Sequence, residues 1–350
     1  MIMKNSNQVI LTTRARIARN IASHRFSSIN NNAEKKDILN LVKNVFFNET
    51  KSKYHIFYSI NKLTRTQRQF LIEKHLMSSE MNTELYGKGL IVNSNPNVKN
   101  KSISIMINEE DHLRIQCIKR GFKIHESYKE IFKIEKNLEK KIKFAYDKDF
   151  GYLTSCPTNL GTALRISIIA HLPALVVSSK IEDFIKNLCK IGCSIRGFFG
   201  ENSEVIGNLF QISNQVSLGK YEEQIVDEMN AICLNIIEEE NKAKYYLMET
   251  KPADVEDSVC RSYGMVKYAK MLSYGESLEF LSMLKLGLDL GIIDNIRSFD
   301  FYNLINLLGE SNILLNYVGS RSKDIKNDEI DKIRADLIKE KILKGIDSDV

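Results

Sequence analysis

The sequence predicts an α+β fold, in which a mostly antiparallel sheet with its helices is followed by an all-helical domain. In the first 250 residues, short β-branched or alternating runs are mixed with amphipathic stretches, without the regular rhythm of a doubly wound fold. After Lys251 and Pro252, strand signals become rare and helical spacing dominates. A chain of 350 residues with 43% hydrophobic content can bury two cores. We therefore expect domains at residues 1–250 and 251–350.

The individual elements follow from hydrophobic spacing. Besides Thr12 to Arg16, strands are predicted at Tyr54–Ile60, Lys88–Val92, Ile103–Ile107, Leu113–Ile118, Leu164–Leu172, Ile195–Phe199 and Asn208–Ser213. Helices of the first domain are predicted at Ala33–Phe47, Thr64–Met77, Phe122–Tyr146, Ser179–Cys189 and Tyr221–Lys244. Ser179 and Glu182 have the spacing of a capping box. Helices of the second domain are predicted at Asp254–Leu272, Ser277–Leu290, Phe299–Leu308 and Asp328–Leu343.

The net charge does not point to a nucleic-acid partner. The 50 Lys and Arg exceed the 44 Asp and Glu by six, but the surplus is spread along the chain. The densest basic stretch, Lys133 to Lys148, is interleaved with acids and is typical of a solvated helix face. We therefore expect no direct contact with nucleic acid.

Cysteine usage and hydropathy predict a protein of the reducing cytoplasm. The six cysteines include no C-x-x-C pair, and Cys189 and Cys193 lack further ligands for zinc, so no metal site is expected. Residues 1–13 lack the regions of a signal peptide. The longest apolar stretch, Ile166 to Val177, is interrupted by His171 and Pro173, so no membrane insertion is expected.

The most informative feature is a set of arginines in segments rich in Gly, Ser and Thr: Arg14, Arg16, Arg114, Arg165 and Arg196. Alternate residues of a strand share a face, so Arg14 and Arg16 would present two guanidinium groups to one side. An arginine keeps its charge in a protein, and a convergent group of them favours an anion such as a triphosphate. The alternative is that each arginine is separately exposed or paired with a carboxylate.

A second feature is the acidic segment Asn108-Glu109-Glu110-Asp111-His112, together with Glu201 in a Gly-flanked loop. Carboxylates suit a cationic acceptor. A guanidinium is a poor nucleophile with a pKa above about 12, so a kinase must orient it and remove a proton. Two other interpretations stay open: the segment is simply a turn, or with His112 it binds a metal.

Two familiar nucleotide motifs do not account for this chain. Asp149-Phe150-Gly151 matches the magnesium-binding tripeptide of eukaryotic-type protein kinases, but the other motifs of those enzymes are absent from the sequence. The G-x-x-x-x-G-K-[ST] loop is absent as well. A bound nucleotide would therefore be held by the arginines.

The segments Asn108–Arg114 and Cys156–Thr162 resemble the phosphagen (guanidino) kinase family, and the resemblance extends over about residues 9–245. Arg196–Glu201 and Gln211–Gln215 look most like the bacterial protein-arginine kinases of this family, whose helical C-terminal domain the last third also resembles. The resemblance implies a phosphagen-kinase-like catalytic domain. It also implies ATP with Mg²⁺ as the nucleotide.

The resemblance also implies roles for individual residues. Nucleotide contacts are expected from Thr13, Arg14, Ala15, Arg16, Ile17, His75, Arg114, Arg165, Ile166, Ser167, Ile168, Ile169, Arg196, Gly197, Phe198, Phe199, Gly200 and Glu201. Glu110 would be the catalytic base, with Glu201 helping to position and deprotonate the guanidinium. Cys156 corresponds to the reactive cysteine beside the acceptor.

The layout of the chain suggests which arginine is the acceptor. Small-molecule guanidino kinases place a helical domain before their first arginine motif, whereas that motif begins here at residue 12. Without such a cover, the acceptor pocket would admit an arginine of a protein chain. The main alternative function is the phosphorylation of free arginine. A non-catalytic adaptor that binds phosphoarginine or nucleotide, and a DNA-binding regulator, are further alternatives.

The C-terminal domain departs from the family at one motif. The relatives carry R-D-x-x-R-A, which binds phosphoarginine allosterically, whereas this chain has Ile330 in the first position, followed by Asp331 and Arg334. Asp331 and Arg334 either grip a phosphorylated guanidinium or form an exposed helix face. The resemblance further implies homodimerisation, an activator protein, a stress-response repressor among the substrates, and delivery of marked proteins to Clp proteases.

Overall fold

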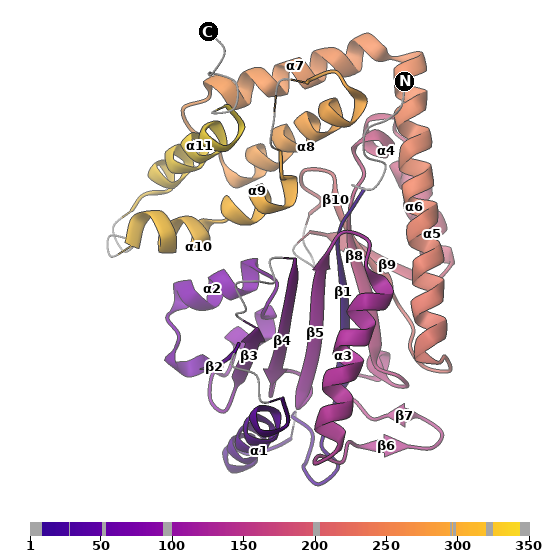
Figure 1. Ribbon diagram of the computed structural model, residues 1–350, viewed down its shortest axis with the longest axis vertical. Helices are drawn as coiled ribbons and strands as arrows, with labels where there is room; N and C mark the ends of the chain where they lie inside the picture. The colour runs from indigo at the N-terminus through magenta and orange to yellow at the C-terminus, as the bar shows by residue number, and fades with distance from the viewer. Residues whose placement is uncertain are drawn as a thin grey trace.

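The computed structural model describes residues 9–27, 29–50, 54–93, 100–198, 204–294, 296, 299–319 and 325–343. Its centre is an eight-stranded sheet in the order β2-β3-β4-β5-β1-β8-β10-β9, and each neighbouring pair is antiparallel. The strands are β1 (Ile10–Arg19), β2 (His55–Ser59), β3 (Gly89–Asn93), β4 (Lys101–Ile107), β5 (Leu113–Arg120), β8 (Leu164–His171), β9 (Cys193–Gly197) and β10 (Leu209–Asn214). The predicted α+β class is confirmed (Figure 1).

Strand β1 lies in the middle of the sheet, between β5 and β8. Its alternation places Ala15 and Ile17 in the hydrophobic core, whereas Arg14 and Arg16 point to the other face. In the pairing register, Arg16 lies opposite both Gln116 of β5 and Arg165 of β8. The register therefore brings arginines from different strands to one face of the sheet.

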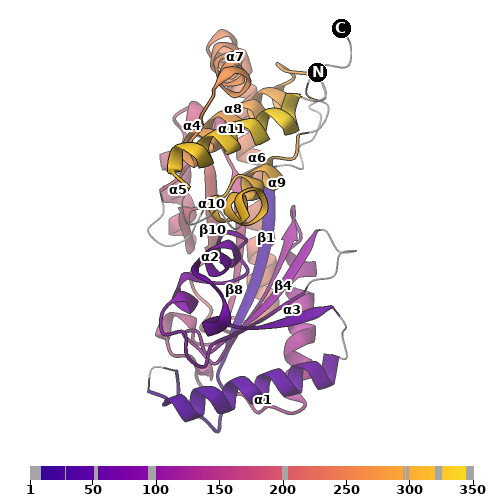
Figure 2. The same cartoon turned by 90° about the vertical axis from the view of Figure 1, so that its left-hand side faces the viewer.

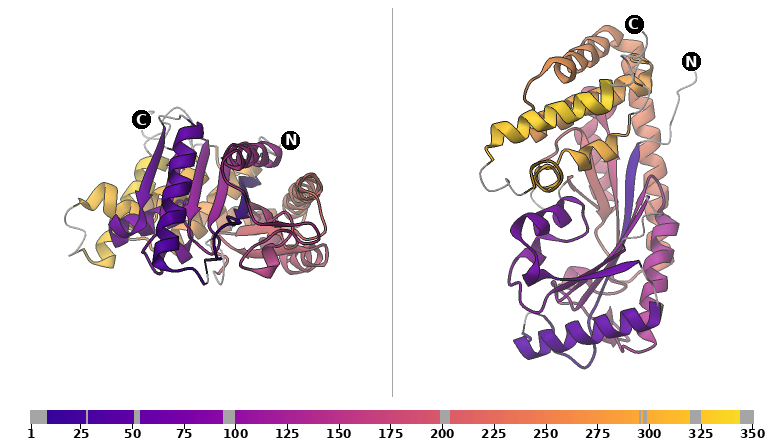
Figure 3. Two further views of the ribbon diagram at one scale, coloured as in Figure 1. Left: turned by 90° about the horizontal axis from the view of Figure 1, so that it is seen from below. Right: turned by 60° about the vertical axis from the view of Figure 1, so that its left-hand side comes forward.

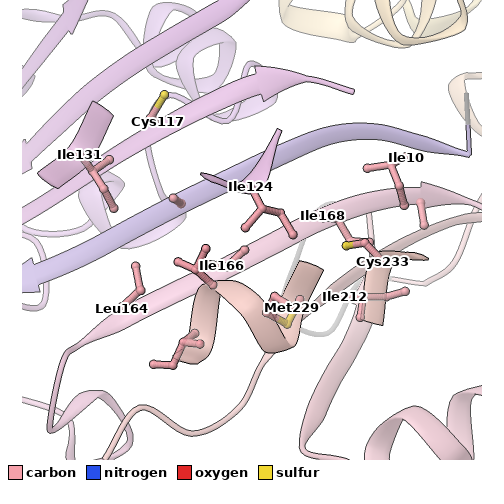
Figure 4. Close-up of a cluster of buried hydrophobic side chains, with 14 of the residues drawn as sticks. Ile10, Cys117, Ile124, Ile131, Leu164, Ile166, Ile168, Ile212, Met229 and Cys233 are labelled. Carbon is pink, nitrogen blue, oxygen red and sulfur yellow. The ribbon is translucent and has the colours of Figure 1, made fainter. Parts of the chain in front are cut away.

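Three helices cover the core face of the sheet: α1 (Asn32–Thr50), α3 (Ile124–Glu139) and α6 (Glu222–Thr250). Figure 4 shows side chains of α3 and α6 meeting those of the strands, with Ile124 beside the sheet and Met229 close to Ile212. Burying this apolar layer stabilises the sheet by about 25 cal/mol for each Å² removed from water. The opposite face carries α2 (Arg65–Glu73) and a smaller apolar cluster around Met81 and Met106.

The second part of the chain is helical, as predicted, and packs on one end of the sheet (Figures 1 and 2). It contains α7 (Pro252–Tyr268), α8 (Tyr274–Leu290), α9 (Phe301–Leu307), α10 (Glu310–Ile313), a π-helical turn (Leu314–Val318) and α11 (Asn327–Leu343). Its core also takes in Leu11, Ile169, Phe198 and Leu209 from the first part. Because the two parts share apolar clusters, the boundary at residue 250 stays a prediction.

The segment between β5 and β9 differs from the predicted helices in two places. The helix predicted to reach Tyr146 ends at Glu139, and β6 (Tyr146–Asp147) pairs with β7 (Gly151–Tyr152) in a short hairpin. The tripeptide Asp149-Phe150-Gly151 is part of this hairpin, where the Asp147 Oδ1 accepts from the Asp149 and Phe150 N–H groups at 2.8 and 3.1 Å. The hairpin closes through local hydrogen bonds, and its ends are tied to other segments by the Ala145 N–H, which donates to the Asn20 carbonyl, and the Tyr152 N–H, which donates to the Gly161 carbonyl, both at 2.8 Å. Hydrophobic spacing does not reveal such contacts.

The predicted capping box at Ser179 is wrong. Ser179 has a left-handed backbone with φ of 60°, because it ends the short helix α4 (Pro173–Val177) in a tight turn. The next helix, α5 (Ile181–Lys190), begins two residues later, with Lys180 in the N-cap position and no capping hydrogen bond from its side chain. Short 3₁₀ turns complete the fold at Ile60–Lys62, Ser79–Asn82 and Pro157–Asn159.

Among the described residues, no helix has the length and apolar character needed to cross a bilayer.

The buried side chain of Arg334 in α11 joins three segments of the helical part by hydrogen bonds. This side chain is 4% exposed, so the expected alternative of an exposed helix face is wrong for this residue. Its Nε donates to the Leu308 carbonyl at 2.9 Å, and its Nη1 donates to the Leu272 carbonyl at 2.8 Å and to Asp331. Asp331 and Arg334 would have to give up these bonds to bind phosphoarginine.

We predict that Arg334→Met lowers the free energy of unfolding by about 2–4 kcal/mol, because two buried carbonyls lose their donor and Asp331 loses its cation. Urea unfolding would measure the loss. Arg261→Met is the matched control: Arg261 is exposed on α7 and forms an exposed ion pair with Asp257 four residues earlier, so a change within about 0.5 kcal/mol is expected. Equal effects of the two substitutions would contradict a stabilising role for the buried hydrogen bonds of Arg334.

Candidate active site

All five arginines singled out in the sequence line one cleft of about 770 Å³ on the face of the sheet away from α3. They come from four strands: Arg14 and Arg16 from β1, Arg114 from β5, Arg165 from β8 and Arg196 from β9. The same cleft is lined by His75, by the acidic segment and by Cys156. The arginines therefore converge on one cleft and are not separately exposed, although Arg114 also pairs with the Glu109 carboxylate, as the alternative allowed.

Neutral side chains hold two of these arginines. The Arg14 Nε donates to the Ser167 hydroxyl and its Nη2 to the Gln211 amide oxygen, both at 3.1 Å. The Arg165 Nε and Nη2 donate to the Ser213 hydroxyl at 3.2 and 3.0 Å. These bonds orient the guanidinium groups without neutralising them. The hydroxyl and amide oxygens that accept these bonds carry no net charge.

Collecting cations here is electrostatically unfavourable in the absence of an anion. Burial, followed by repulsion from Arg114 and Arg165, lowers the pKa of Arg14 to about 9, at which it is still protonated at neutral pH. Burial, Arg114 and Arg14 lower the pKa of Arg16 in the same way. A polyanion would remove this repulsion. The cleft is therefore suited to a triphosphate.

His75 follows α2 and reaches the arginine end of the cleft. Its backbone is left-handed with φ of 55°, and its carbonyl accepts from the Gln116 Nε2 at 2.7 Å. Its ring lies edge-on to Phe198, with 4.9 Å between the ring centroids. Burial, helped by the charge of Arg14, lowers the pKa of His75 to about 3. His75 is thus neutral in the physiological range and offers an uncharged ring to the cleft.

The acidic segment is a tight turn between β4 and β5. Asn108 has a left-handed backbone with φ of 57°, and its N–H donates to the His112 carbonyl at 3.0 Å. The Asn108 amide also donates to the Lys35 and Gly87 carbonyls, both at 2.8 Å. These bonds fix the turn against the neighbouring loops.

His112 has a structural role in this turn. Its Nδ1 accepts from the Ile21 N–H at 3.0 Å, and its Nε2 lies 2.8 Å from the Arg25 carbonyl. Burial lowers its pKa to about 4. In the part of the chain that the structure describes, no group of three or more His, Cys, Asp or Glu side chains is arranged to hold a metal ion.

The two glutamates of the turn have different environments. The Glu109 carboxylate is buried, pairs with Arg114, and accepts from the Ser78 hydroxyl at 2.5 Å. Burial alone would raise its pKa, but Arg114 and these hydrogen bonds hold the pKa below the ordinary value. Glu110 lines the cleft and is accessible to solvent, and partial desolvation of its carboxylate by the cleft walls, together with the charges of Asp111 and Glu109, raises its pKa. Only Glu110 therefore combines access with a pKa shifted toward that of a general base.

Asp111 links the turn to the loop that carries Cys156. Its Oδ1 accepts from the Asn20 amide and from the Ser155 N–H, both at 2.7 Å. Cys156 lines the cleft, with its Sγ 3.0 Å from the Thr158 hydroxyl. Further along this loop, Gly161 has φ of 94°, and a Cβ there would lie 2.6 Å from the Ser217 carbonyl oxygen. The loop position thus depends on a glycine.

Several expected contact residues turn away from the cleft. The side chains of Ala15, Ile166 and Ile168 are buried in the core, because neighbouring residues of a strand face opposite sides. The Thr13 hydroxyl donates to the Gly121 carbonyl at 2.7 Å, on the core side of β1. These four side chains therefore cannot contact a nucleotide in the cleft.

The remaining expected residues divide into three groups. Ile17 packs in the core and also borders the cleft. Ile169, Gly197 and Phe198 lie at the end of the sheet, and Ile169 and Phe198 pack against the helical part. Phe199, Gly200 and Glu201 lie outside the described residues.

Gln211 and Ser213 had not been assigned a role from the sequence. They hold Arg14 and Arg165, and both belong to the stretch Gln211–Gln215 that resembles the family. Their alternate spacing on a predicted strand was the available signal, since it places both on one face.

Comparison with known proteins agrees with this site. The family model described as ATP:guanido phosphotransferase, C-terminal catalytic domain, matches residues 37–243, and the protein-arginine kinase McsB C-terminal domain model matches residues 252–349. A protein-arginine kinase of Bacillus cereus (strain AH187) is 38% identical over 338 residues, which is 96% of this chain and 93% of the relative. A protein-arginine kinase of Bacillus anthracis (strain CDC 684 / NRRL 3495) has the same identity and coverage.

Solved structures share the fold at lower identity. The crystal structure of lombricine kinase superposes with a TM-score of 0.59 at 22% identity and covers 68% of each chain. The duplicated taurocyamine kinase from Schistosoma mansoni, with bound transition-state-analogue components, has a TM-score of 0.61 at 21% identity, covering 84% of this chain and 49% of the other. With the cleft geometry and the sequence matches, the conclusion is that this chain belongs to the ATP:guanido phosphotransferase family and carries the C-terminal domain of the protein-arginine kinases.

Proposed function

We propose that this protein transfers the γ-phosphoryl group of ATP to the guanidinium group of arginine residues in proteins. The observation that carries the proposal is the charge distribution of a single cleft: five arginines line it together with the acidic turn that bears Glu110. A triphosphate fits the first set of charges and a guanidinium fits the second. Both the family match and the names of the relatives support this assignment.

At the nucleotide end, the arginines neutralise the phosphates and orient them. Phosphoryl transfer depends mainly on in-line positioning and on stabilising the charge of the moving group. Because Ser167, Gln211 and Ser213 hold Arg14 and Arg165 in place, the guanidinium groups are oriented before ATP binds. Lysine would not reproduce these planar, two-sided contacts.

At the acceptor end, Glu110 removes a proton from the target guanidinium. The freed nitrogen lone pair attacks the γ-phosphorus, a P–N bond forms, and the bond from the γ-phosphorus to the bridging oxygen breaks. ADP leaves with that oxygen, and the proton remains on the Glu110 carboxylate. Cys156, in the loop tied to Asp111, is proposed to lie beside the acceptor, and Glu201 is proposed to assist Glu110.

Mg²⁺ is proposed to accompany ATP and would supply further neutralisation of the phosphate charge. Mg²⁺ prefers oxygen ligands and usually retains several waters. Because no group of three or more His, Cys, Asp or Glu side chains among the described residues is arranged to hold a metal, the ion would be held chiefly by the nucleotide phosphates and by water.

The cellular context rests on resemblance. We infer that unfolded or regulatory proteins are the substrates, among them a stress-response repressor, and that phosphorylated proteins pass to Clp proteases. An activator protein, homodimerisation and a cytoplasmic location are part of the same proposal. Phosphorylation of free arginine is the competing function.

The first test is to incubate the purified protein with magnesium ATP and an arginine-rich unfolded protein, in parallel with free arginine. Acid-labile phosphate is then mapped by mass spectrometry. Phosphoarginine on the protein is the expected result. Label on free arginine alone would identify a phosphagen kinase, and nucleotide binding without any transfer would favour a non-catalytic adaptor.

Glu110→Gln is predicted to lower the rate of transfer by about 10²–10⁴-fold, because the amide cannot accept the proton. Nucleotide binding should be retained, since the arginines are unchanged. Initial rates of ADP release and calorimetric titration with MgADP would separate the two effects. Asp149→Asn, in the β6–β7 hairpin, should keep its activity. Full turnover by Glu110→Gln would show that another group is the base.

The pH dependence of the rate is predicted to show an acid limb above pH 4.5, the ordinary pKa of a glutamate. A base acts when deprotonated, so a raised pKa of Glu110 moves the loss of activity on acidification to higher pH. His75 and His112, with pKa values of about 3 and 4, would not produce this limb. Profiles of kcat/KM against pH would measure it. Persistence of the same limb in the residual activity of Glu110→Gln would contradict the assignment.

A further inference from the structure

Through α9 and α10, the helical part of the chain contacts α2 and the end of β5, beside the arginine end of the cleft. Figures 2 and 3 show α10 beside α2, and their residues are in contact. This contact lies next to His75, which is two residues beyond the end of α2 and lines the cleft. The arginine end of the cleft therefore has neighbours from both parts of the chain.

A first anchor joins α2 to α10. Both carboxylate oxygens of Glu73, the last residue of α2, accept from the Ser311 N–H at 3.2 Å. The next residue, Lys74, donates its Nζ to the Asn306 carbonyl of α9 at 3.1 Å. Gly309 makes room for the Glu73 carboxylate, because a Cβ at this position would lie 2.6 Å from Oε2.

A second anchor joins β5 to α9. The Arg120 guanidinium donates two hydrogen bonds to the Asp300 carboxylate, at 2.8 and 2.5 Å. Asp300 is also the N-cap of α9, because its side chain accepts from the Asn303 N–H at 3.1 Å. A paired fork of this kind fixes orientation as well as distance. The start of α9 is therefore fixed to the end of β5.

Between the two anchors, α9 presents Tyr302 to the rear of the nucleotide site. A cavity of about 10 Å³, the size of one water molecule, is lined by Tyr302 together with Arg14, His75, Ser167 and Gln211. Arg14 and His75 line this cavity on one side and the main cleft on the other. A shift of α9 would therefore reach the residues that face the nucleotide.

We propose that Glu73 and Asp300 are positioning residues for ATP: they hold the α9–α10 segment against α2 and β5, and so fix His75 and Arg14 at the arginine end of the cleft. This inference rests on the proposed function, since it places the nucleotide at the arginines. It makes ATP affinity a property of both parts of the chain. The acceptor end of the cleft is built on the acidic turn and the Cys156 loop, so Glu73 and Asp300 are not expected to affect acceptor binding.

Two substitutions in the full-length chain test the anchors. Gly309→Ala places a methyl group against the Glu73 carboxylate, while Gly309 has φ of −58°, which alanine adopts without strain. Asp300→Asn removes the charge that Arg120 needs but keeps a good N-cap for α9. Each is expected to raise KM for ATP and Kd for MgADP about three- to tenfold, the size of one net hydrogen bond. The kcat and the KM for the arginine acceptor should stay near the wild-type values.

Matched controls come from α7. Gly264→Ala adds the same methyl group where no atom lies within 4 Å, and Asp257→Asn removes an equivalent charge from the exposed pair with Arg261. Both should bind MgADP as the wild type does. If Gly309→Ala is unstable in a thermal melt, Lys74→Met replaces it, because it removes the bond to Asn306 without adding bulk at Gly309.

The outcomes separate this inference from the proposed function. Wild-type MgADP affinity in Gly309→Ala and Asp300→Asn would overturn the positioning roles while leaving the kinase assignment intact. Failure of the wild type itself to bind MgADP would instead remove the proposed function. An equal loss of kcat and of affinity for both substrates would show a general loss of structure, and would also overturn the inference.

Discussion

Repulsion among five arginines in one cleft is the constraint on which the remaining structure depends. Burial and mutual repulsion lower the pKa values of Arg14 and Arg16, so the fold must keep these side chains together against their charge. The surrounding groups hold the guanidinium groups in place mainly by hydrogen bonds to uncharged oxygens. Hydroxyl and amide oxygens of Ser167, Gln211 and Ser213 accept the guanidinium hydrogens and leave the positive charge in place. Carboxylates in the same positions would stabilise the protein without ligand but would compete with a triphosphate.

In the acidic turn, by contrast, one of the two glutamates is held by a group of opposite charge. Glu109 is buried and compensated by Arg114, whereas Glu110 is accessible and lies beside other carboxylates. Two neighbouring residues of one type thus have pKa values shifted in opposite directions, which supports the proposal that Glu110 and not Glu109 takes up the proton. Asn108 makes the division possible, because its left-handed backbone and amide hydrogen bonds fix the direction in which the turn leaves β4.

The helical part is bound to the sheet by shared apolar packing and by ionic contacts. Leu11 and Ile169 of the central strands belong to the same hydrophobic cluster as Leu281 and Ile338 of the helices. At the cleft, this packing is supplemented by Glu73 and by the pair of Arg120 with Asp300. These contacts lie close to His75 and Arg14, which is the basis of the proposal that the helical part positions these two residues.

The sequence by itself determined the strands of the main sheet, most helices and the shared face of Arg14 and Arg16, because these features depend on local periodicity. It also placed Glu110 and Cys156 in segments typical of the family. Only the tertiary structure decided that Arg114, Arg165 and Arg196 lie on the same face as Arg14 and Arg16, since this depends on the register of strands that are distant in sequence. The structure likewise decided that Ala15 and Ile166 face the core and that Arg334 is buried. Local spacing cannot reveal these positions, because long-range packing and hydrogen bonds fix the surroundings of each side chain.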